Sequence, residues 1–310
     1  MGKKKVQGLS RTFLTLVAKF CFGDKKMEQA LQIATSVIHK NLIIKVQRVR
    51  TGPKGHGLLA IIRLLVYAVL KEYFHTRFLE QHLRKRPRVW RALGFASRPS
   101  RAAIDRWKRQ HIVELREIIS LLGDEYLAAV DAHWTILDST TLEDYADPDA
   151  RWGNNSKGRF KGFKLHISVD ERSVPLRASF TTGNVADCTQ GKALLAPTPY
   201  NGGDAGYDVQ ELKDASRDIG STPVFVHNPR REGKEKKRKT PKKLKKVRVK
   251  VEQANSIIKH PVMREMWFLV KGFKQKATLA FASVLALQAF ALHSLRTWGY
   301  PSLRISEAKI

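Results

Sequence analysis

The 310-residue chain carries 57 Lys and Arg against 28 Asp and Glu, a formal net charge of +29, and 43% of its residues are hydrophobic. That hydrophobic share is enough for a folded core, which excludes a disordered polycation, while the charge indicates a polyanionic partner such as nucleic acid. A ribosomal or merely solubilising basic surface is the alternative. The two cysteines, Cys21 and Cys188, form no C-x-x-C pair, which argues against a disulfide framework or a zinc site and fits a reducing cytoplasm.

The apolar stretches of the chain fit buried helices better than membrane spans. The basic N-terminus lacks an apolar segment followed by a cleavage site, so we expect no secretory signal. Residues 58–70 are interrupted by Arg63, and residues 277–295 are interrupted by polar side chains. Neither stretch provides the roughly 20 uninterrupted apolar residues of a span, so we expect core helices and no membrane partner.

Residues 1–128 have the apolar spacing of an all-α N-terminal domain, with Gly and Pro between its helices. Ser100 is positioned to cap a helix that opens at Arg101. Residues 71–116 hold 13 Lys and Arg and four acids, so at least one helix face is basic. A DNA-binding surface and a plain solvated face both explain this pattern.

From residue 131 the sequence changes to an α/β pattern. Residues 131–150 form an acidic island that has six acids and no Lys or Arg, and we expect Asp144 in an exposed loop. Three strand-like runs, two of them at hairpin spacing around Asp170, are followed by two further strands that alternate with helices. This order predicts a mixed five-stranded sheet flanked by helices. Residues 229–250, with 13 basic residues and two acids, are expected to form a basic loop before a C-terminal helix.

Three acids occupy comparable positions in this predicted sheet. Asp138 ends the first strand, Asp204 ends the fourth, and Glu252 enters the helix after the basic loop. If the first and fourth strands are neighbours, the two aspartates lie side by side, where they would repel each other unless divalent cations hold them. An all-oxygen set suits Mg²⁺, with Mn²⁺ as a substitute, for phosphodiester chemistry. Taken singly, the acids also fit a strand-end cap, a turn former and a helix-start acid.

Several sequence blocks follow one another in the order typical of a known family. The blocks ILDSTTLE, KGRFKGFKLHISVD, TTGNVADC, GGDAGYD and RVKVEQANSIIK resemble those of the DDE insertion-sequence transposases of prokaryotes, whose catalytic core has the ribonuclease H fold. In the last block, Arg248, Glu252 and Lys259 have the spacing of the Tyr-Arg-Glu-Lys signature of one subgroup, with Lys245 at the tyrosine position. The resemblance covers residues 131–296.

The resemblance implies a ribonuclease H-like catalytic domain over residues 129–310, preceded by a DNA-end-binding domain over residues 1–128. Asp138, Asp204 and Glu252 would be both the catalytic and the metal-binding residues. Arg248 and Lys259 would hold phosphates of the DNA ends, and we add three further lysines to the predicted DNA-binding set: Lys245, Lys161 and Lys164. A solvated strand edge is the other explanation for the last two.

The function that follows is a DNA transposase with a Mg²⁺ cofactor. It would cleave the terminal inverted repeats of its insertion sequence and join the 3′-hydroxyl ends to target DNA by two-metal-ion chemistry. Double-stranded DNA would be its partner, and the family implies a homodimer in the DNA complex, in the prokaryotic cytoplasm and at the nucleoid when bound to DNA. A catalytically inactive or co-opted DNA-binding protein, and a ribonuclease H-like nuclease without strand transfer, fit the same residues.

Overall fold

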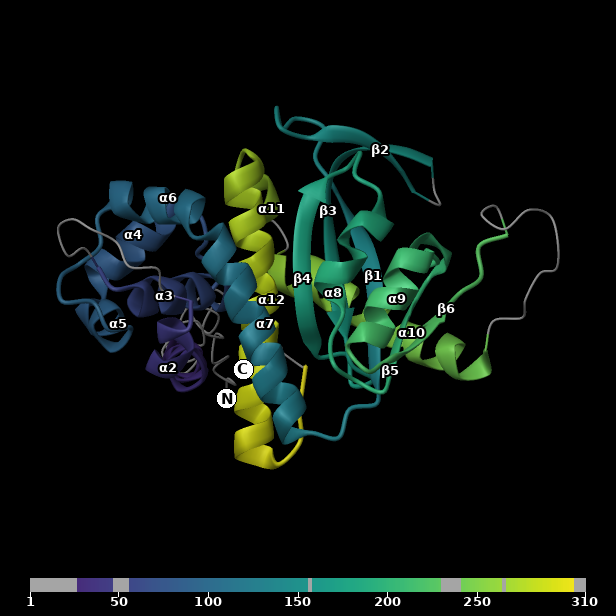
Figure 1. Cartoon of the computed structure of the whole chain (residues 1–310). Coiled ribbons are helices and arrows are strands. Elements are labelled where there is room, and N and C mark those ends of the chain that lie inside the picture. The colour runs from purple at the N-terminus through teal and green to yellow at the C-terminus, as the bar shows by residue number, and fades with distance from the viewer. Residues whose placement is uncertain (1–26, 47–55, 156–157, 230–240, 264–265, 304–310) are drawn as a thin grey trace, which may run out of the picture.

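The helical N-terminal region predicted from the sequence is present in the structure. The computed structural model describes residues 27–46, 56–155, 158–229, 241–263 and 266–303 (Figure 1). Ser100 caps α6 as expected, because its Oγ accepts a hydrogen bond of 3.2 Å from the backbone N–H of Ala103. Residues 27–37 are helical, and the helices that follow are α2 (Lys40–Ile44), α3 (Leu58–Leu70), α4 (Thr76–Lys85), α5 (Pro87–Ala92), α6 (Arg101–Gln110) and α7 (Ile112–Ala129).

A mixed sheet of six strands follows these helices. The strands are β1 (Trp134–Glu143), β2 (Arg151–Asn155), β3 (Gly158–Val169), β4 (Pro175–Thr182), β5 (Tyr200–Gly203) and β6 (Thr222–Phe225). Strand β3 pairs antiparallel with β1, β2 and β4, whereas β5 pairs parallel with β1 and β6. Five of the strands therefore have the spatial order β4-β3-β1-β5-β6, which is the predicted ribonuclease H-like sheet. Strand β2 adds a sixth strand beside β3.

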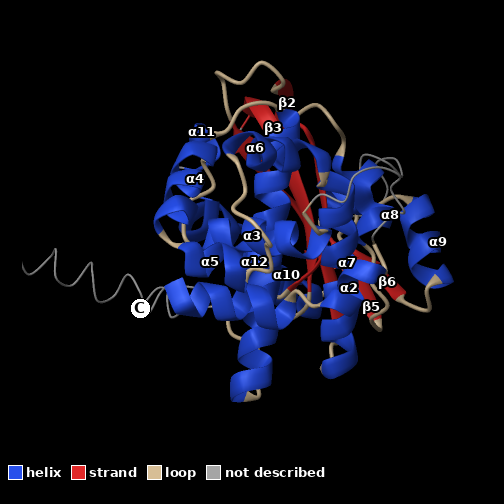
Figure 2. Cartoon of the chain, turned by 90° about the vertical axis from the view of Figure 1, so that its left-hand side faces the viewer, coloured by secondary structure: helices blue, strands red, loops and turns tan. Residues whose placement is uncertain are grey.

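Helices cover both faces of the sheet (Figure 2). On β1, Trp134 and Ile136 belong to the main hydrophobic core, to which α7, α10 (Lys242–Ile257) and α12 (Phe273–Trp298) contribute. Leu137 points to the opposite face, as the alternation of a strand requires, and packs in a smaller cluster with Leu194 and Leu212. Those two residues come from α8 (Gly191–Leu194) and α9 (Gln210–Asp218), so the sheet lies between two helical layers.

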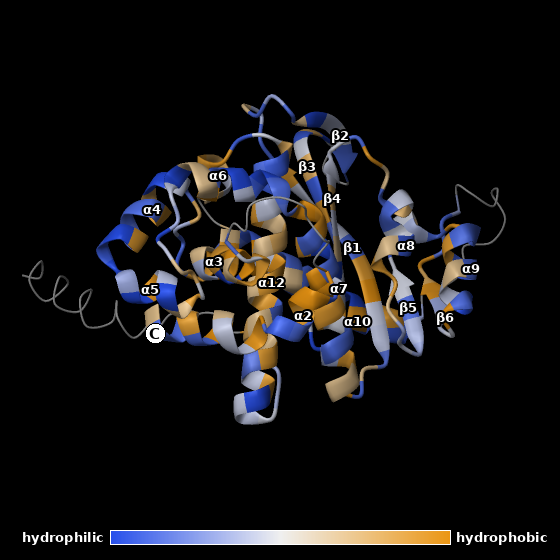
Figure 3. Ribbon diagram, turned by 60° about the vertical axis from the view of Figure 1, so that its left-hand side comes forward, coloured by the Kyte–Doolittle hydropathy of each residue, from blue (hydrophilic) through white to orange (hydrophobic). Residues whose placement is uncertain are grey.

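Helix α12 joins the N-terminal helices to the sheet. It contacts α3, α6 and α7 as well as β4, and one hydrophobic core runs through all of them (Figure 3). Among the described residues it is the one helix long and apolar enough to cross a membrane, but 89% of its apolar window is buried inside the protein. The apolar stretches that form α3 and α12 are therefore core helices, as predicted. The predicted boundary between residues 128 and 129 marks a change of secondary structure and stays a prediction as a division of function.

The prediction of a basic loop over residues 229–250 is wrong from residue 242 onward. Helix α10 begins at Lys242 and includes the last part of that run, whereas residues 230–240 lie outside the described residues. Leu244, Val251 and Ala254 are buried at helical spacing, so an apolar stripe anchors the helix while most of its basic side chains stay at the surface. The composition of this segment does not indicate a helix, because its few apolar residues are outnumbered by lysines.

The acidic island is a structural clasp at the start of α12, so the prediction of an exposed Asp144 is wrong. The carboxylate of Asp144 is buried and lies 2.7 Å from Nζ of Lys276, which is also buried. Asp147 accepts a hydrogen bond of 2.8 Å from the backbone N–H of Gly272. The acids after β1 therefore neutralise a buried lysine and satisfy backbone donors before the first turn of α12. Asp170 lies in the β3–β4 turn, as predicted, and accepts hydrogen bonds from backbone N–H groups of that turn.

Candidate active site

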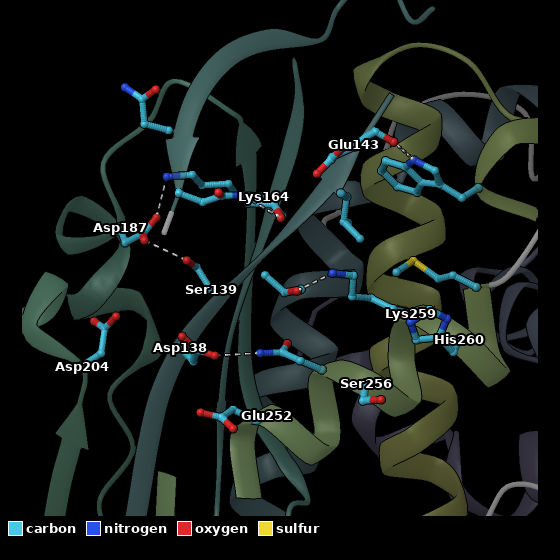
Figure 4. Close-up of a pocket in the computed structure, with 18 of the residues that line it drawn as sticks. Asp138, Ser139, Glu143, Lys164, Asp187, Asp204, Glu252, Ser256, Lys259 and His260 are labelled. Atoms are coloured by element: carbon cyan, nitrogen blue, oxygen red, sulfur yellow. Dashed lines mark hydrogen bonds and ion pairs between the residues drawn. The ribbon is translucent and has the colours of Figure 1, made fainter. Parts of the chain in front are cut away.

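The predicted acids line one open cleft of about 1310 Å³. Its walls are the second half of β1, helix α10, the π-helical turn Ile258–Met263 and helix α11 (Met266–Leu269). Figure 4 shows the carboxylates of Asp138, Asp204 and Glu252 around the same part of the cleft, each from a different segment of the chain. Arg248 and Lys259 line it as well, so the sequence correctly grouped five residues that are up to 121 positions apart.

The position of the two aspartates follows from the register between β1 and β5. The parallel pairing runs from Trp134 beside Tyr200 to Leu137 beside Gly203, and it stops there. Asp138 and Asp204 directly follow the last paired residues of β1 and β5, so both side chains lie where the two strands separate. Asp138 does not end its strand, contrary to the prediction, because β1 continues along β3 to Glu143. What ends at Asp138 is the parallel pairing.

Burial and neighbouring negative charges disfavour the ionised form of Asp138. Its pKa is raised to about 7, mainly by desolvation, then by the charge of Asp204 and to a smaller extent by Glu252. Burial also raises the pKa of Asp204, although a 2.9 Å hydrogen bond from the backbone N–H of Gly206 favours its ionised form. Arg248 lowers the pKa of both aspartates, so the guanidinium provides part of the positive charge that this group of acids needs.

Helix α10 presents its functional residues along one face. Arg248, Glu252 and Asn255 are four and three positions apart, which places them one above another on the helix surface. Nδ2 of Asn255 donates a hydrogen bond of 3.0 Å to Oδ2 of Asp138. In the π-helical turn that follows, Nζ of Lys259 donates a hydrogen bond of 3.0 Å to Oγ1 of Thr140. Both contacts tie the helix to β1.

The remaining predicted DNA-binding lysines lie differently. Lys164 is buried, and its Nζ lies 2.9 Å from Oδ1 of Asp187, so the ammonium group is already paired inside the protein. Lys161 donates from Nζ to the backbone carbonyl of Tyr145 at 3.1 Å and does not line the cleft. Lys245 is exposed on α10, also outside the cleft lining. Lys161 and Lys245 therefore lie away from the cleft, whereas Lys164 lines it with its ammonium group paired to Asp187.

The donor chemistry of the cleft fits a hard divalent cation. Asp138, Asp204 and Glu252 offer carboxylate oxygens, which Mg²⁺ and Mn²⁺ prefer. The desolvated Asp138 beside like charges is the environment that a bound cation would stabilise. In this conformation, however, no three His, Cys, Asp or Glu side chains of the described part of the chain are gathered closely enough to hold an ion.

Two residues of the site were not predicted as parts of it. Asn255 follows Glu252 by three positions, so helical periodicity was the signal that would have placed it beside the acids. Asp187 lies after β4, within the block TTGNVADC. It accepts a hydrogen bond of 2.8 Å from Oγ of Ser139 on β1, next to Asp138, besides its ion pair with Lys164 on β3. No local pattern in the sequence indicates this long-range contact.

Curated proteins and a solved structure are similar to parts of this chain. Probable transposases for insertion sequence element ISH11, from the R1 and NRC-1 strains of Halobacterium salinarum, are each 24% identical to the chain over 192 residues. Those matches cover 57% of this chain and 56% of each relative, so the chain spans about half the length of the curated relatives it matches. A solved structure, the piggyBac transposase synaptic complex with hairpin DNA, aligns with 95% of this chain and 78% of its own, at 10% identity and a TM-score of 0.42.

The family model for the transposase DDE domain matches residues 133–288, which contain β1 to β6 and all three predicted acids. The finer assignment to the Tyr-Arg-Glu-Lys subgroup stays a prediction. The matched segment makes up half of the chain and includes every wall of the cleft. The chain therefore belongs to the transposase DDE domain family.

Proposed function

We propose that this chain is a DNA transposase that cleaves the ends of its insertion sequence and joins the 3′-hydroxyl ends to target DNA. One observation carries the proposal, which is that Asp138, Asp204 and Glu252 line a single cleft in a chain of the DDE transposase family. The cleft is open and basic residues flank the acids, as the approach of a polyanionic duplex requires.

The three carboxylates would hold the divalent cations, Mg²⁺ or Mn²⁺. When bound, two such ions about 4 Å apart activate the attacking oxygen and stabilise the departing oxygen of a phosphodiester. Asp138 and Asp204 follow adjacent paired residues of β1 and β5, so they would provide the fixed part of the ligand set. Glu252 is exposed on α10 and would complete the set by turning toward them.

Other residues of the cleft orient these acids and bind DNA. The amide of Asn255 holds the Asp138 carboxylate in place, and Arg248 stabilises the ionised form of both aspartates. Arg248 and Lys259 would also contact phosphates next to the reacting one, since charged donors to phosphate position a duplex without reading its sequence. Lys259 would do so from a fixed place, because Thr140 already anchors its ammonium group.

The assembly and its location are part of the same proposal. Transposition brings two DNA ends together, so the active form would be a homodimer bound to the terminal inverted repeats and the target duplex. A net charge of +29 favours association with the nucleoid in a prokaryotic cytoplasm, and weak sequence-independent binding would fall steeply with salt.

A plasmid assay tests this function. The DNA that flanks the coding region is incubated with wild-type protein in Mg²⁺ or Mn²⁺, and the products are compared with those of Asp138→Asn and Glu252→Gln. Asp218→Asn is the control, because it removes an exposed acid of α9 outside the cleft. We expect wild type and control to cut at the flanking ends and join them to target, whereas the two cleft variants bind DNA and do neither.

Two other outcomes identify the alternatives. Equal binding by all proteins with no cutting by any would establish the DNA-binding protein and exclude the enzyme. Cutting of structured or hybrid nucleic acid without joining of a labelled 3′ end would establish a nuclease. Both alternatives share the cleft with the transposase, so only the reaction products distinguish them.

A further inference from the structure

A second pocket, of about 560 Å³, adjoins helix α11, which also lines the active-site cleft. Trp267 and Phe268 of this helix line the cleft, and Leu269, which follows directly, lines the second pocket. The remaining wall of the second pocket comes from the N-terminal helices, at the first residues of α4 and α6. The two pockets therefore have consecutive residues of α11 in their walls.

The second pocket is rich in unneutralised positive charge. Arg77 and Arg101 line it and are exposed, and within the described residues neither has an acid at ion-pair distance. Lys271 also lines it and lies 3.6 Å from Asp144, an acid that already pairs with Lys276.

The one acid in the lining is Asp105, whose carboxylate is already occupied. It pairs with Arg109 and accepts a hydrogen bond of 3.3 Å from Nε2 of Gln275. Asp105 therefore does not neutralise the two exposed arginines.

A buried lysine behind the pocket holds the segment that carries Thr76 and His75, two residues of the pocket lining. Lys108 is fully buried, and its Nζ donates to the backbone carbonyl of Phe74 and, at 3.1 Å, to Oγ1 of Thr76. These bonds fix the segment that leads into α4. His75 makes no side-chain capping bond there, so the first N–H groups of α4 add their partial positive charge to the pocket. Burial, followed by Lys108, Arg101 and Arg77, lowers the pKa of His75, as a positive environment requires.

We propose that this pocket binds a backbone phosphate of the same DNA duplex whose reacting phosphate lies in the active-site cleft. The inference rests on the proposed function, and it adds a specific contact by which the N-terminal helices position the DNA. Phosphate contacts in both pockets fix the direction of the duplex, whereas a contact in the cleft alone leaves it free to pivot. The exposed Phe268 lines the cleft, and the exposed Leu269, the next residue, lines the second pocket.

The test measures DNA binding in EDTA, so that no cleavage occurs. A duplex of the DNA that flanks the coding region is titrated with wild type, Arg77→Gln and Arg101→Gln over a range of salt concentrations. Arg84→Gln and Arg106→Gln are the matched controls, because they remove the same charge from exposed positions on α4 and α6 outside the pocket. Each pocket variant should raise Kd about tenfold. It should also reduce the slope of log K against log salt concentration by about 0.9, the value for one lost phosphate contact, and the controls should change neither quantity.

Phosphate ethylation of the duplex then locates the contact. Wild type should show an interference position away from the cleavage point that disappears in Arg77→Gln, while the positions near the cleavage point stay. Wild-type binding by both pocket variants, or equal losses in the controls, would overturn the pocket even if the protein cuts DNA normally. Pocket-dependent binding by a protein that never cuts would keep the phosphate site and reject the transposase function.

Discussion

Asn255 and Asp138 are 117 positions apart in the sequence and are joined by a hydrogen bond of 3.0 Å from the amide Nδ2 to the carboxylate Oδ2. The bond links α10, which carries Glu252, to β1 at the point where the parallel pairing of β1 with β5 ends. It therefore holds the helix of the third acid beside the strand of the first. The bond involves only Oδ2 of Asp138, and the carboxylate also experiences the negative charge of Asp204.

Asn255→Ala should slow DNA cleavage by about 10- to 100-fold, because it frees the Asp138 carboxylate while keeping every acid in place. Binding of the flanking duplex in EDTA should stay at the wild-type level. Single-turnover cleavage rates at increasing Mg²⁺ measure the effect, and the Mg²⁺ concentration for half-maximal rate should rise. Val249→Ala is the comparison, since it truncates an exposed side chain of the same helix outside the cleft. Wild-type rates for Asn255→Ala would show that the amide does not position Asp138.

The sequence predicted the central sheet well because its strands have distinct local signals. The β3–β4 hairpin consists of two apolar runs joined by a turn, and it lies where the pattern placed it; the short strand before Asp204 is also where it was predicted, although its sequence is Tyr-Asn-Gly-Gly. The predicted first and fourth strands, β1 and β5 of the structure, are neighbours, which brings Asp138 and Asp204 together. Glu252 was predicted from its place at the start of a helix and from the spacing of the family signature after Arg248. The residues that could be found were those marked by a local strand or helix pattern and by the resemblance to the family.

The misplaced parts depend on contacts between segments distant in sequence. From the sequence, Asp144 was predicted to be a loop acid, whereas in the structure it pairs with Lys276, 132 positions later. Lys164 reads as a surface lysine until Asp187 pairs with it in the interior. Strand β2 has no apolar alternation, and Gly153 approaches the backbone of Gly183 so closely that a Cβ would lie 2.0 Å from its carbonyl oxygen. Such contacts have no period and no local composition that would indicate them.

The clasp around Lys276 predicts a stability effect far from the reacting groups. Lys276→Met would remove the buried cation between Asp144 and Asp147 and leave Asp144 only the exposed Lys271 at 3.6 Å, so the free energy of unfolding should fall by about 3 to 5 kcal/mol. Urea unfolding followed by circular dichroism measures it. Lys274→Met, at an exposed position of the same helix, should change it by less than about 0.5 kcal/mol. Adding Asp144→Leu to Lys276→Met should recover part of the loss, and no recovery would argue against the ion pair as the cause.

The buried pair of Tyr67 and His82 predicts a dependence of stability on pH. Nε2 of His82 lies 2.7 Å from the Tyr67 hydroxyl, and burial first, then Arg86 and Lys71, lowers the pKa of this histidine from 6.5 to about 4. Between these two pH values the unfolded chain binds a proton that the folded chain does not. The stabilising contribution is therefore present above pH 6.5 and is lost as pH falls to about 4, by roughly 3 kcal/mol.

Two variants separate this titration from the hydrogen bond itself. Tyr67→Phe and His82→Phe both remove the bond and should cost about 1 to 3 kcal/mol near neutral pH. Only His82→Phe should also flatten the loss of unfolding free energy between pH 6.5 and 4, because Tyr67→Phe keeps the buried histidine. Equal pH profiles for the two variants would assign the acid sensitivity to another group.

At Gly123 of α7, a change to Ala should destabilise the protein, although the same change usually stabilises a helix. In an open helix, Ala is more stable than Gly by about 1 kcal/mol, but here a Cβ would lie 2.3 Å from the backbone oxygen of Leu176 on β4. A backbone oxygen cannot rotate away, so Gly123→Ala must push the helix off the sheet, at a cost of roughly 1 to 3 kcal/mol in unfolding free energy. Gly57→Ala has open space around its Cβ, so its cost should come only from the change of the N-cap residue of α3, up to about 1 kcal/mol. A stabilised Gly123→Ala would mean that α7 does not pack this closely on β4, and the shared core of the N-terminal helices and the sheet would need revision.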